Sequence, residues 1–485
     1  MSAPMLEDPP ASQNRRLKAD DPTVIILSSS LLTDRMFRYS GFTDVLAANS
    51  KPHLWATSVR NPENQDWCVE SSLKVEPFPQ IQPFKEFPYN YLRRLNDYVW
   101  DYSQQPPSRI SMMRHVRDKS LPFVIRALKA PARAIAMVGG HSSLENRVER
   151  LLLTFPRSVE ASERLRQTRP SVVVTTGPFQ FDQPAVVAAA KNLGIPVMAM
   201  IPSWDNVSTK NRMVFKYDGY LVWSKQTRDE LHYFYPQSRK VPIYIVGASQ
   251  FDVFFQPRFQ RDRREFASGL GLNADLPIIV YAVGSPNFLA GEKFGALDLA
   301  ERIDRGELGD VQLVIRPHPI HDNAEMAELF HRFSKRIVLQ RTAKAGTPLI
   351  ARSQSEDKIV EWVNTFRHAD VVVNLSSTVT IDAAIFDRPV VNLDYDCAPG
   401  QPHQQLVREI NHHWTHFKPV AESGGVWLVN NSEEMVAAVR EYLRRPELHR
   451  ERRRWMAEYV CGYLDGRCGE RTAEAILDFC KHRTA

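Results

Sequence analysis

Three neighbouring hydroxyl side chains, at Ser376, Ser377 and Thr378, lie between a buried-strand pattern and a helical pattern. The strand pattern is the run of valines at 371–373, which is typical of a parallel strand buried on both faces. Hydroxyls at the carboxyl end of a strand and the start of a helix are well placed to hold a phosphate. Serines also cap helices without binding a ligand, so on spacing alone both interpretations stay open.

A second chemical group ends the strand pattern VQLVIRPH at 311–318. Pro317 and Pro319 fix the backbone around His318, and Arg316 lies at the strand end. An imidazole and a guanidinium placed there can meet a phosphate or a leaving-group oxygen, and arginine can do so bidentately. The hydroxyl cluster belongs to the same predicted sheet, so we expect both groups to meet one phosphate.

A transferase also needs a group that takes a proton from the acceptor, and Asp205 is the preferred candidate. It follows the strand pattern 195–201, and Trp204 beside it is expected to form a sugar platform and to raise the carboxyl pKa by desolvation. An Asx-type helix cap over 207–210 is the alternative role for Asp205. His141 is the second candidate, on the acceptor side, and Asp34 is the third.

The elements that must position these residues alternate as strand and helix in two series. Strands are predicted at 23–27, 53–59, 171–175, 195–201, 220–223 and 243–246, and then at 277–283, 311–315, 336–340, 370–374, 389–393 and 425–429. Such repeated βα units predict an α/β protein with two doubly wound, Rossmann-like parallel sheets. The predicted domains are a disordered tail (1–21), an acceptor-side domain (22–260) with a helical insertion at about 80–168, and a donor-binding domain (261–485) with terminal helices.

The combination of RPHP at 316–319 with SSTVTIDAAIFDRPVVNLD at 376–394 resembles the nucleotide-binding domain of the CDP-glycerol glycerophosphotransferase and capsular-polysaccharide transferase group. Bacterial sialyltransferases share a similar His-Pro and Ser-Ser pair. The resemblance implies the two-domain GT-B architecture, a last helix that braces the first domain, and an acidic residue, Asp382, near the donor. The predicted donor-binding residues are Gly284, Ser285, Arg316, His318, Ser376, Ser377, Thr378 and Asp382, and His318 is also a catalytic candidate.

Composition sets limits on location and cofactors. The chain has 485 residues, 43% of them hydrophobic, and no apolar run as long as a spanning helix or a signal-peptide core, so we expect a cytoplasmic protein. Its five cysteines show no CxxC spacing, so we expect no disulfide and no structural zinc. We also expect no metal or other cofactor: the pair Asp394 and Asp396 is interpreted as a loop, and the histidines at 403, 412, 413 and 416 as cleft rim or surface.

The net charge of +6 comes from one segment, 85–133, which has ten basic residues and four acidic ones. Aromatic residues interleave with the basic ones there, which suits an anionic membrane surface and would place the protein on the inner face of the cytoplasmic membrane. A solvated helical insertion whose aromatic residues form its own core explains the same pattern. No nucleic-acid-binding motif accompanies the charge.

The sequence therefore predicts metal-independent transfer of a sugar or polyol phosphate from a nucleotide-activated donor to a surface-polysaccharide or lipid-linked acceptor. The alternative enzyme is a non-hydrolysing UDP-N-acetylglucosamine 2-epimerase. That group shows a serine followed by two glycines, and paired glutamates, where this chain has Ser376, Ser377, Thr378 and Asp382. A catalytically silent glycan-binding protein of the same fold is the alternative from another class.

Overall fold

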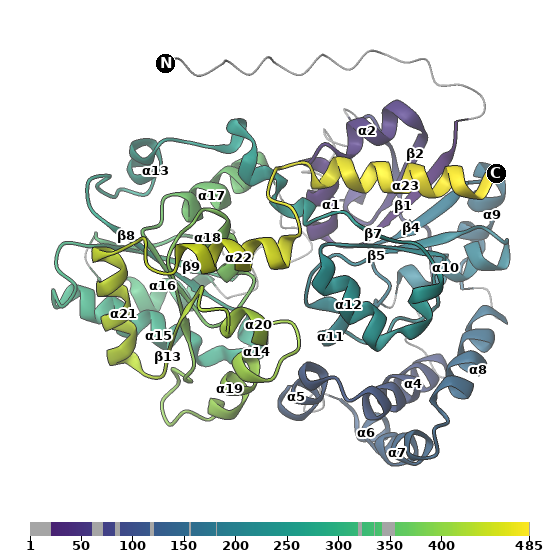
Figure 1. Cartoon of the computed structure of the whole chain (residues 1–485), viewed down its shortest axis with the longest axis horizontal. Coiled ribbons are helices and arrows are strands. Elements are labelled where there is room, and N and C mark those ends of the chain that lie inside the picture. Colours follow the sequence, from purple (N-terminus) through teal and green to yellow (C-terminus); the bar gives the residue numbers. More distant parts are fainter. Residues whose placement is uncertain are drawn as a thin grey trace.

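The chain folds into two parallel β-sheets, each covered by helices (Figure 1). The computed structural model describes residues 21–60, 71–82, 88–116, 121–154, 157–180, 182–318, 323–333, 335–341 and 355–484. The segment predicted to be disordered lies outside these residues except for Asp21, and so does Pro319 of the RPHP motif.

Within the described residues, the first sheet has seven strands in the order β3-β2-β1-β4-β5-β6-β7, and the second has six in the order β10-β9-β8-β11-β12-β13. All neighbouring strands pair in parallel. The strands are β1 (Thr23–Ser28), β2 (Lys51–Ala56), β3 (Lys74–Pro77), β4 (Val172–Thr175), β5 (Val197–Met200), β6 (Gly219–Val222), β7 (Ile243–Ile245), β8 (Ile278–Val283), β9 (Gln312–Pro317), β10 (Ile337–Leu339), β11 (Val371–Asn374), β12 (Val390–Leu393) and β13 (Trp427–Val429). The predicted fold class is confirmed.

The helices lie before, between and after these strands. In the first part of the chain they are α1 (Leu31–Arg38), α2 (Phe42–Asn49), α4 (Tyr89–Gln104), α5 (Pro107–His115), α6 (Phe123–Ala127), α7 (Lys129–Met137), α8 (His141–Thr154), α9 (Val159–Thr168), α10 (Gln183–Asn192), α11 (Asn206–Thr209) and α12 (Lys225–Phe234). In the second part they are α13 (Arg263–Gly269), α14 (Pro286–Leu289), α15 (Lys293–Asp304), α16 (Asn323–Phe330), α17 (Glu356–Arg367), α18 (Val379–Ile385), α19 (Gln404–His412), α20 (Lys418–Ala421), α21 (Ser432–Arg444), α22 (Arg450–Cys461) and α23 (Cys468–Thr484).

Burial on both faces explains why the central strands are continuous apolar runs. Val24 and Ile26 of β1 belong to a core that includes residues of α2 and α23, whereas Ile25 and Leu27 belong to a core that includes residues of α10. Successive side chains of a strand point to opposite faces, so a strand with helices on both sides needs apolar residues at every position.

Two local patterns in the first domain mislead. The polar and proline-rich stretch 61–82 predicts no strand, yet it contains β3, a half-exposed edge strand in which Lys74 and Glu76 break the apolar pattern. Apolar residues at helical intervals over 33–48 predict one helix, but the structure has the pair α1 and α2, with Gly41 at the break. A Cβ atom at Gly41 would lie 2.7 Å from Glu470 of α23, so the break makes room for the last helix.

Helices α4 to α9 form the insertion between β3 and β4, and in Figure 1 most of them lie below the first sheet. The insertion has a small core of its own around Tyr98, Val99 and Met113. Trp100 packs instead against Tyr235 of the first domain, with ring centroids 5.4 Å apart. The interpretation of the insertion's aromatic residues as core therefore holds for Tyr98 and Trp100.

The two halves are joined on two sides. The last helix, α23, crosses back onto the first domain as the resemblance implied, and Tyr244 of β7 donates to Asp478 at 3.0 Å (Figure 1). On the other side, α5 of the insertion meets the second domain, where Arg114 pairs with Glu409 of α19 at 2.9 Å. The predicted donor-binding range 261–485 thus ends in a helix that packs on the first sheet.

Candidate active site

A cavity of about 500 Å³ lies between the two domains, at the carboxyl ends of strands from both sheets. Every predicted donor-binding residue lines it from the second domain, namely Gly284, Ser285, Arg316, His318, Ser376, Ser377, Thr378 and Asp382. Trp204 and Asp205 line it from the first domain. Ligands of open α/β sheets bind at such edges. The structure therefore brings the two predicted groups of residues to one space.

Two predicted acceptor-side residues, His141 and Asp34, do not line the cavity. His141 is the first residue of α8, in the insertion. The carboxylate of Asp34 accepts from Ser28 at 2.5 Å at the end of β1, and burial raises its pKa in spite of the hydroxyl donors. On geometry, Asp205 is the candidate of the three that faces the donor side.

The serine loop after β11 is held by side-chain amides. Asn374 accepts from the backbone N–H of Ser377 at 3.1 Å and from Asn392 at 3.1 Å, so the end of β12 supports the loop. Ser376 has a φ of 35°, a left-handed conformation that costs about 1–2 kcal/mol in a residue other than glycine. Its hydroxyl donates to Asn411 of α19 rather than into the cavity. The Ser377 hydroxyl donates weakly to Asn374, at 3.4 Å, so Thr378, whose hydroxyl accepts from Trp204, is better oriented to donate to a ligand.

Arg316 is oriented at the end of β9 by two acceptors on its Nη1 atom. Gln340 accepts at 2.6 Å and Glu361 at 2.9 Å. A guanidinium has five N–H donors, so donors on its other nitrogens remain for an anion. Lys358 lies in the same wall and shares Glu361 with Arg316, at 2.8 Å.

Arg35 of α1 lines the same cavity from the first domain and has no motif that points to it in the sequence. Its guanidinium carbon lies 4.1 Å from the ring centre of Trp362, and Nη2 donates to Gln250 at 3.1 Å. The buried Nε has no hydrogen-bond partner. Burial lowers the pKa of Arg35 to about 10, so it is still a cation at neutral pH. Arg35 lies one turn into α1, the helix that follows the carboxyl end of β1. That position in the sequence could have indicated that it faces the cavity.

Two buried acids in the wall are not fully charged at neutral pH: Glu292 is mostly protonated and Asp382 is about half ionised. Burial raises the pKa of Asp382 to about 7, although Trp362, which donates to it at 3.0 Å, and Arg35 oppose the shift. Burial also raises the pKa of Glu292 to about 8. Glu292 accepts from the backbone N–H groups of Gly284 at 2.7 Å and Leu375 at 2.9 Å, and so joins the loops after β8 and β11. Because these acids are partly or mostly protonated, the arginines give the cavity a positive potential that suits a diphosphate.

The pKa of Asp205 differs from the predicted one. Burial alone would raise its pKa, but Lys210, His416 and hydroxyl donors outweigh that, and its pKa lies below the ordinary value. The predicted rise through desolvation was wrong because the carboxylate accepts from Ser203 at 2.5 Å, Thr209 at 2.8 Å and the Asn206 amide at 3.0 Å. Asp205 stands at the N-cap of α11, yet its side chain accepts from no backbone N–H of that helix.

Trp204 connects the two domains at the cavity. Its indole is almost fully buried, and Nε1 donates to the Thr378 hydroxyl of the serine loop at 3.3 Å. Its ring meets that of His416 edge to face, with centroids 4.9 Å apart. The prediction that His416 lies at the rim or surface was wrong: it is buried and lines the cavity.

Asp394 and Asp396 are engaged by the loop that follows β12. Asp394 accepts from Asn411 at 2.9 Å and pairs with His412 at 2.9 Å, while Asp396 accepts from the backbone N–H of His403 at 2.7 Å. In the described part of the chain, no group of three or more His, Cys, Asp or Glu residues is arranged to hold a metal ion.

Two facing, doubly wound sheets with a polar cavity between them define a GT-B type transferase. The sequence pattern of the CDP-Glycerol:Poly(glycerophosphate) glycerophosphotransferase family matches residues 188–478, which is more than half of the chain. The chain belongs to that family. The resemblance to this family and the prediction of a transferase are confirmed.

Solved structures share the fold at low identity. A putative UDP-N-acetylglucosamine 2-epimerase from Listeria monocytogenes is 14% identical with a TM-score of 0.56, and covers 95% of this chain and 97% of its own. The S. aureus MnaA structure with UDP is 12% identical with a TM-score of 0.54 and the same coverage. A glycosyltransferase from Rickettsia africae is 9% identical with a TM-score of 0.51, and covers 95% of this chain and 99% of its own. A search of curated proteins found no match.

Proposed function

We propose that the protein transfers a polyol phosphate or a sugar from a nucleotide-activated donor to a hydroxyl of a surface-polysaccharide or lipid-linked acceptor, without a metal. One observation carries the proposal: Arg35, Arg316 and His318 and the serine-loop hydroxyls line one cavity whose buried acids have raised pKa values. Such a cavity suits the diphosphate of a nucleotide donor, and the glycerophosphotransferase family supplies the reaction class.

In this proposal the second domain holds the donor. Arg316 and Arg35 bind the diphosphate from the two domains, and hydroxyl and imidazole donors stabilise the charge that grows on the departing nucleotide. For a CDP-glycerol donor, the acceptor oxygen forms a bond to the phosphorus next to glycerol. The bond from that phosphorus to the bridging oxygen breaks, and CMP leaves with the electron pair.

A second cavity, of about 290 Å³, suits the acceptor. It lies between the ends of β4 and β5 and helix α5, and residues of α11 form part of its wall. Thr176, Gln180, Asn206, Lys210 and Asn211 line it. Amides, hydroxyls and a lysine match a polyol, a glycan or a phosphate-linked polymer, and Asn206 and Thr209 also bond to Asp205.

The test is a thermal-shift screen with CDP, CDP-glycerol, UDP-N-acetylglucosamine and CMP-activated sugars, followed by turnover with each donor that binds. A ligand at 100 times its dissociation constant should stabilise the protein by about 2.7 kcal/mol. Transfer from CDP-glycerol to poly(glycerophosphate) with release of CMP is the expected reaction. Binding of UDP-N-acetylglucosamine with epimerisation and no transfer would favour the epimerase instead, and no binding of any of these compounds would contradict the proposal.

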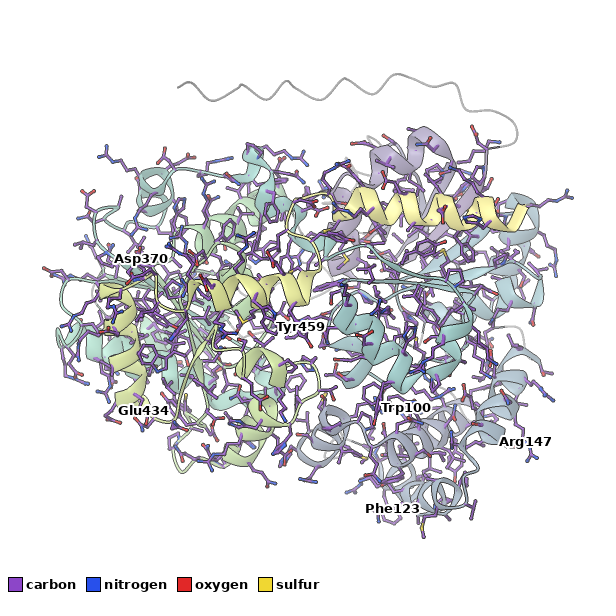
Figure 2. The ribbon with its side chains drawn as sticks, in the orientation of Figure 1. Trp100, Phe123, Arg147, Asp370, Glu434 and Tyr459 are labelled. Atoms are coloured by element: carbon purple, nitrogen blue, oxygen red, sulfur yellow. The ribbon has the colours of Figure 1, made fainter. Side chains whose placement is uncertain are left out.

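The same proposal places the insertion on an anionic membrane that carries the acceptor. Phe123, Val124, Met137 and Val138, at the ends of α6 and α7, have side chains 63–87% exposed, and Figure 2 shows Phe123 at the outer edge of the molecule. Exposed Arg126 and Arg133 lie on the same two helices. Apolar side chains with cations beside them match an acyl-chain boundary with anionic headgroups. No helix among the described residues is long and apolar enough to cross a membrane.

Co-sedimentation with lipid vesicles tests this surface. The protein should bind phosphatidylcholine vesicles that contain 30% phosphatidylglycerol, a fraction on the order of that in an anionic leaflet, and binding should weaken with salt. The double change Phe123→Ser and Met137→Ser should abolish it. Tyr233→Ser removes a ring that is 66% exposed on α12 and is the matched control. Equal binding by the double variant and the control would remove the membrane from the proposal.

Donor binding should weaken as pH rises, because ionised Asp382 repels a diphosphate. The pKa of this carboxyl, raised by burial to about 7, makes it neutral at pH 6 and charged at pH 8. The dissociation constant of CDP-glycerol should therefore rise by up to about tenfold between these values. CDP-glycerol is the right probe because its diphosphate is esterified at both ends and does not titrate in this range. In calorimetry, Asp382→Asn should lose most of this pH dependence and keep only the smaller part that comes from Glu292, whose pKa is about 8.

A further inference from the structure

His416 is a histidine in the donor cavity that the proposed donor contacts do not use. It lies in the loop between α19 and α20, is 5% exposed, and lines the cavity opposite the loop that carries Asp205. Aromatic rings fix its position: Trp204 at 4.9 Å, Trp414 at 5.8 Å and Phe417 at 6.3 Å between centroids. Its Nδ1 is buried and has no hydrogen-bond partner.

A buried polar atom without a hydrogen-bond partner lowers the stability of the fold by roughly 1–3 kcal/mol. Such an atom in a native structure therefore calls for an explanation, such as a catalytic role. Other histidines of the same stretch are satisfied or exposed. His412 pairs with Asp394 at 2.9 Å, and His413 is exposed. His416 therefore stands apart from its neighbours in having an imidazole enclosed at the cavity without a structural hydrogen bond on Nδ1.

Asp205, the residue expected to take the acceptor's proton, is poorly prepared for that role. Its carboxylate already accepts two hydroxyl hydrogen bonds, from Ser203 and Thr209, and one from an amide. These donors, with Lys210 and His416, stabilise the charged form and hold its pKa low in spite of burial. A base stabilised in its anionic form has a small driving force to accept a proton.

His416 differs from Asp205 in the lone pair that it offers: its ring is neutral at neutral pH and its Nδ1 accepts no hydrogen bond. Burial lowers its pKa to about 4, so the ring is a weak base until a nearby negative charge stabilises its protonated form. The charged groups that act on it are Asp205, which favours the protonated ring, and Lys210, which opposes it. Both belong to the α11 region of the first domain, so the proton affinity of a residue in the second domain depends on contact between the domains.

We propose that His416 is the general base of the transfer, and that Asp205 is a positioning residue whose negative charge stabilises the imidazolium that forms. This inference rests on the proposed function and assigns its proton-transfer step. The acceptor hydroxyl gives its proton to a ring nitrogen of His416 while its oxygen bonds to the transferred group. The bond to the nucleotide breaks, and the nucleotide leaves with that electron pair, so no oxidant or reductant takes part.

The test compares His416→Gln and His416→Asn with the control His413→Gln. CDP-glycerol is the donor probe, poly(glycerophosphate) is the acceptor, and CMP release is measured from pH 6 to 9 beside CDP-induced thermal shifts. Both His416 variants should keep the CDP shift and lose about 100-fold or more in kcat with little change in donor KM. The logarithm of their residual rate should rise with pH with a slope of about one, because hydroxide replaces the missing base. The control should match the wild type.

The outcomes distinguish failure of the general-base role of His416 from failure of the proposed transferase function. If the wild type transfers glycerophosphate and the His416 variants do so within threefold, or with the same pH profile as the wild type, the general-base role is overturned and the transferase proposal stands. If the variants lose the CDP shift together with turnover, His416 is part of the donor site or of the fold, and the inference is also overturned. If the wild type neither binds nor turns over any donor of the screen, the proposed function fails and the inference with it.

Discussion

Replacement of His318 with alanine is expected to remove half or more of the thermal stabilisation that CDP gives to the protein. His318 directly follows β9 and lines the donor cavity beside Arg316. A hydrogen bond between an imidazole and a phosphate oxygen is charge-assisted and contributes about 1.5–3 kcal/mol. Its loss should raise the dissociation constant of CDP by roughly 10- to 150-fold, which lowers the stabilisation at 100 times the wild-type dissociation constant from about 2.7 kcal/mol to between about 0.3 and 1.4 kcal/mol.

The matched control is His331→Ala. His331 is an exposed histidine after α16, in the same domain, and does not line the cavity. Its substitution should leave the CDP shift unchanged. Arg316→Lys adds a second measurement, because lysine keeps the charge and loses the bidentate fork, so affinity should fall by less than with His318→Ala. A full CDP shift in His318→Ala would place the diphosphate elsewhere and remove the donor site described here.

The sequence predicted the fold well because its strands are buried on both faces. The runs at 172–174, 278–280 and 371–373 consist of apolar residues that are buried in their sheets, and this pattern is local. The prediction of the donor side followed from the same logic. The carboxyl ends of all strands in a parallel sheet meet at one edge, and β9 and β11 lie on either side of β8, so Arg316 and the serine loop could be paired without coordinates.

Residues that approach the cavity from helices escaped prediction. Arg35 and Glu292 lie outside any motif, and they reach the site only because α1 and the turn before α15 pack at its edge. The environment of Asp205 depends on His416, more than 200 residues away in the sequence and in the other domain. Spacing could not separate His416 from His412 and His413, since these histidines differ in tertiary contacts and not in local sequence.

The position of His416 and Asp205 on different domains makes the transfer step sensitive to domain contact. Trp204, which precedes Asp205, donates to Thr378 of the serine loop at 3.3 Å and packs on His416. The same contact therefore joins the acceptor side, the donor loop and the imidazole. Binding of both substrates would favour the closed arrangement, in which the base is next to its stabilising carboxylate and water is excluded.

Asp205→Asn is expected to lower kcat by about 100-fold or more while the CDP shift is kept, because the substitution removes the charge that stabilises the imidazolium of His416. Asp229→Asn, a change at an exposed carboxylate on α12, is the control and should have no effect. Loss of activity alone does not tell a base from a positioning residue, so the double variant Asp205→Asn/His416→Gln is decisive.

If Asp205 acts through His416, the double variant should be little slower than His416→Gln alone, because a carboxylate has no imidazolium left to stabilise. The measurement is kcat for the wild type, both single variants and the double variant in one buffer at pH 7. Multiplicative losses would show that Asp205 has a task of its own, such as proton removal. Strong non-additivity, together with donor binding that both single variants retain, would make the pair one unit that spans the two domains.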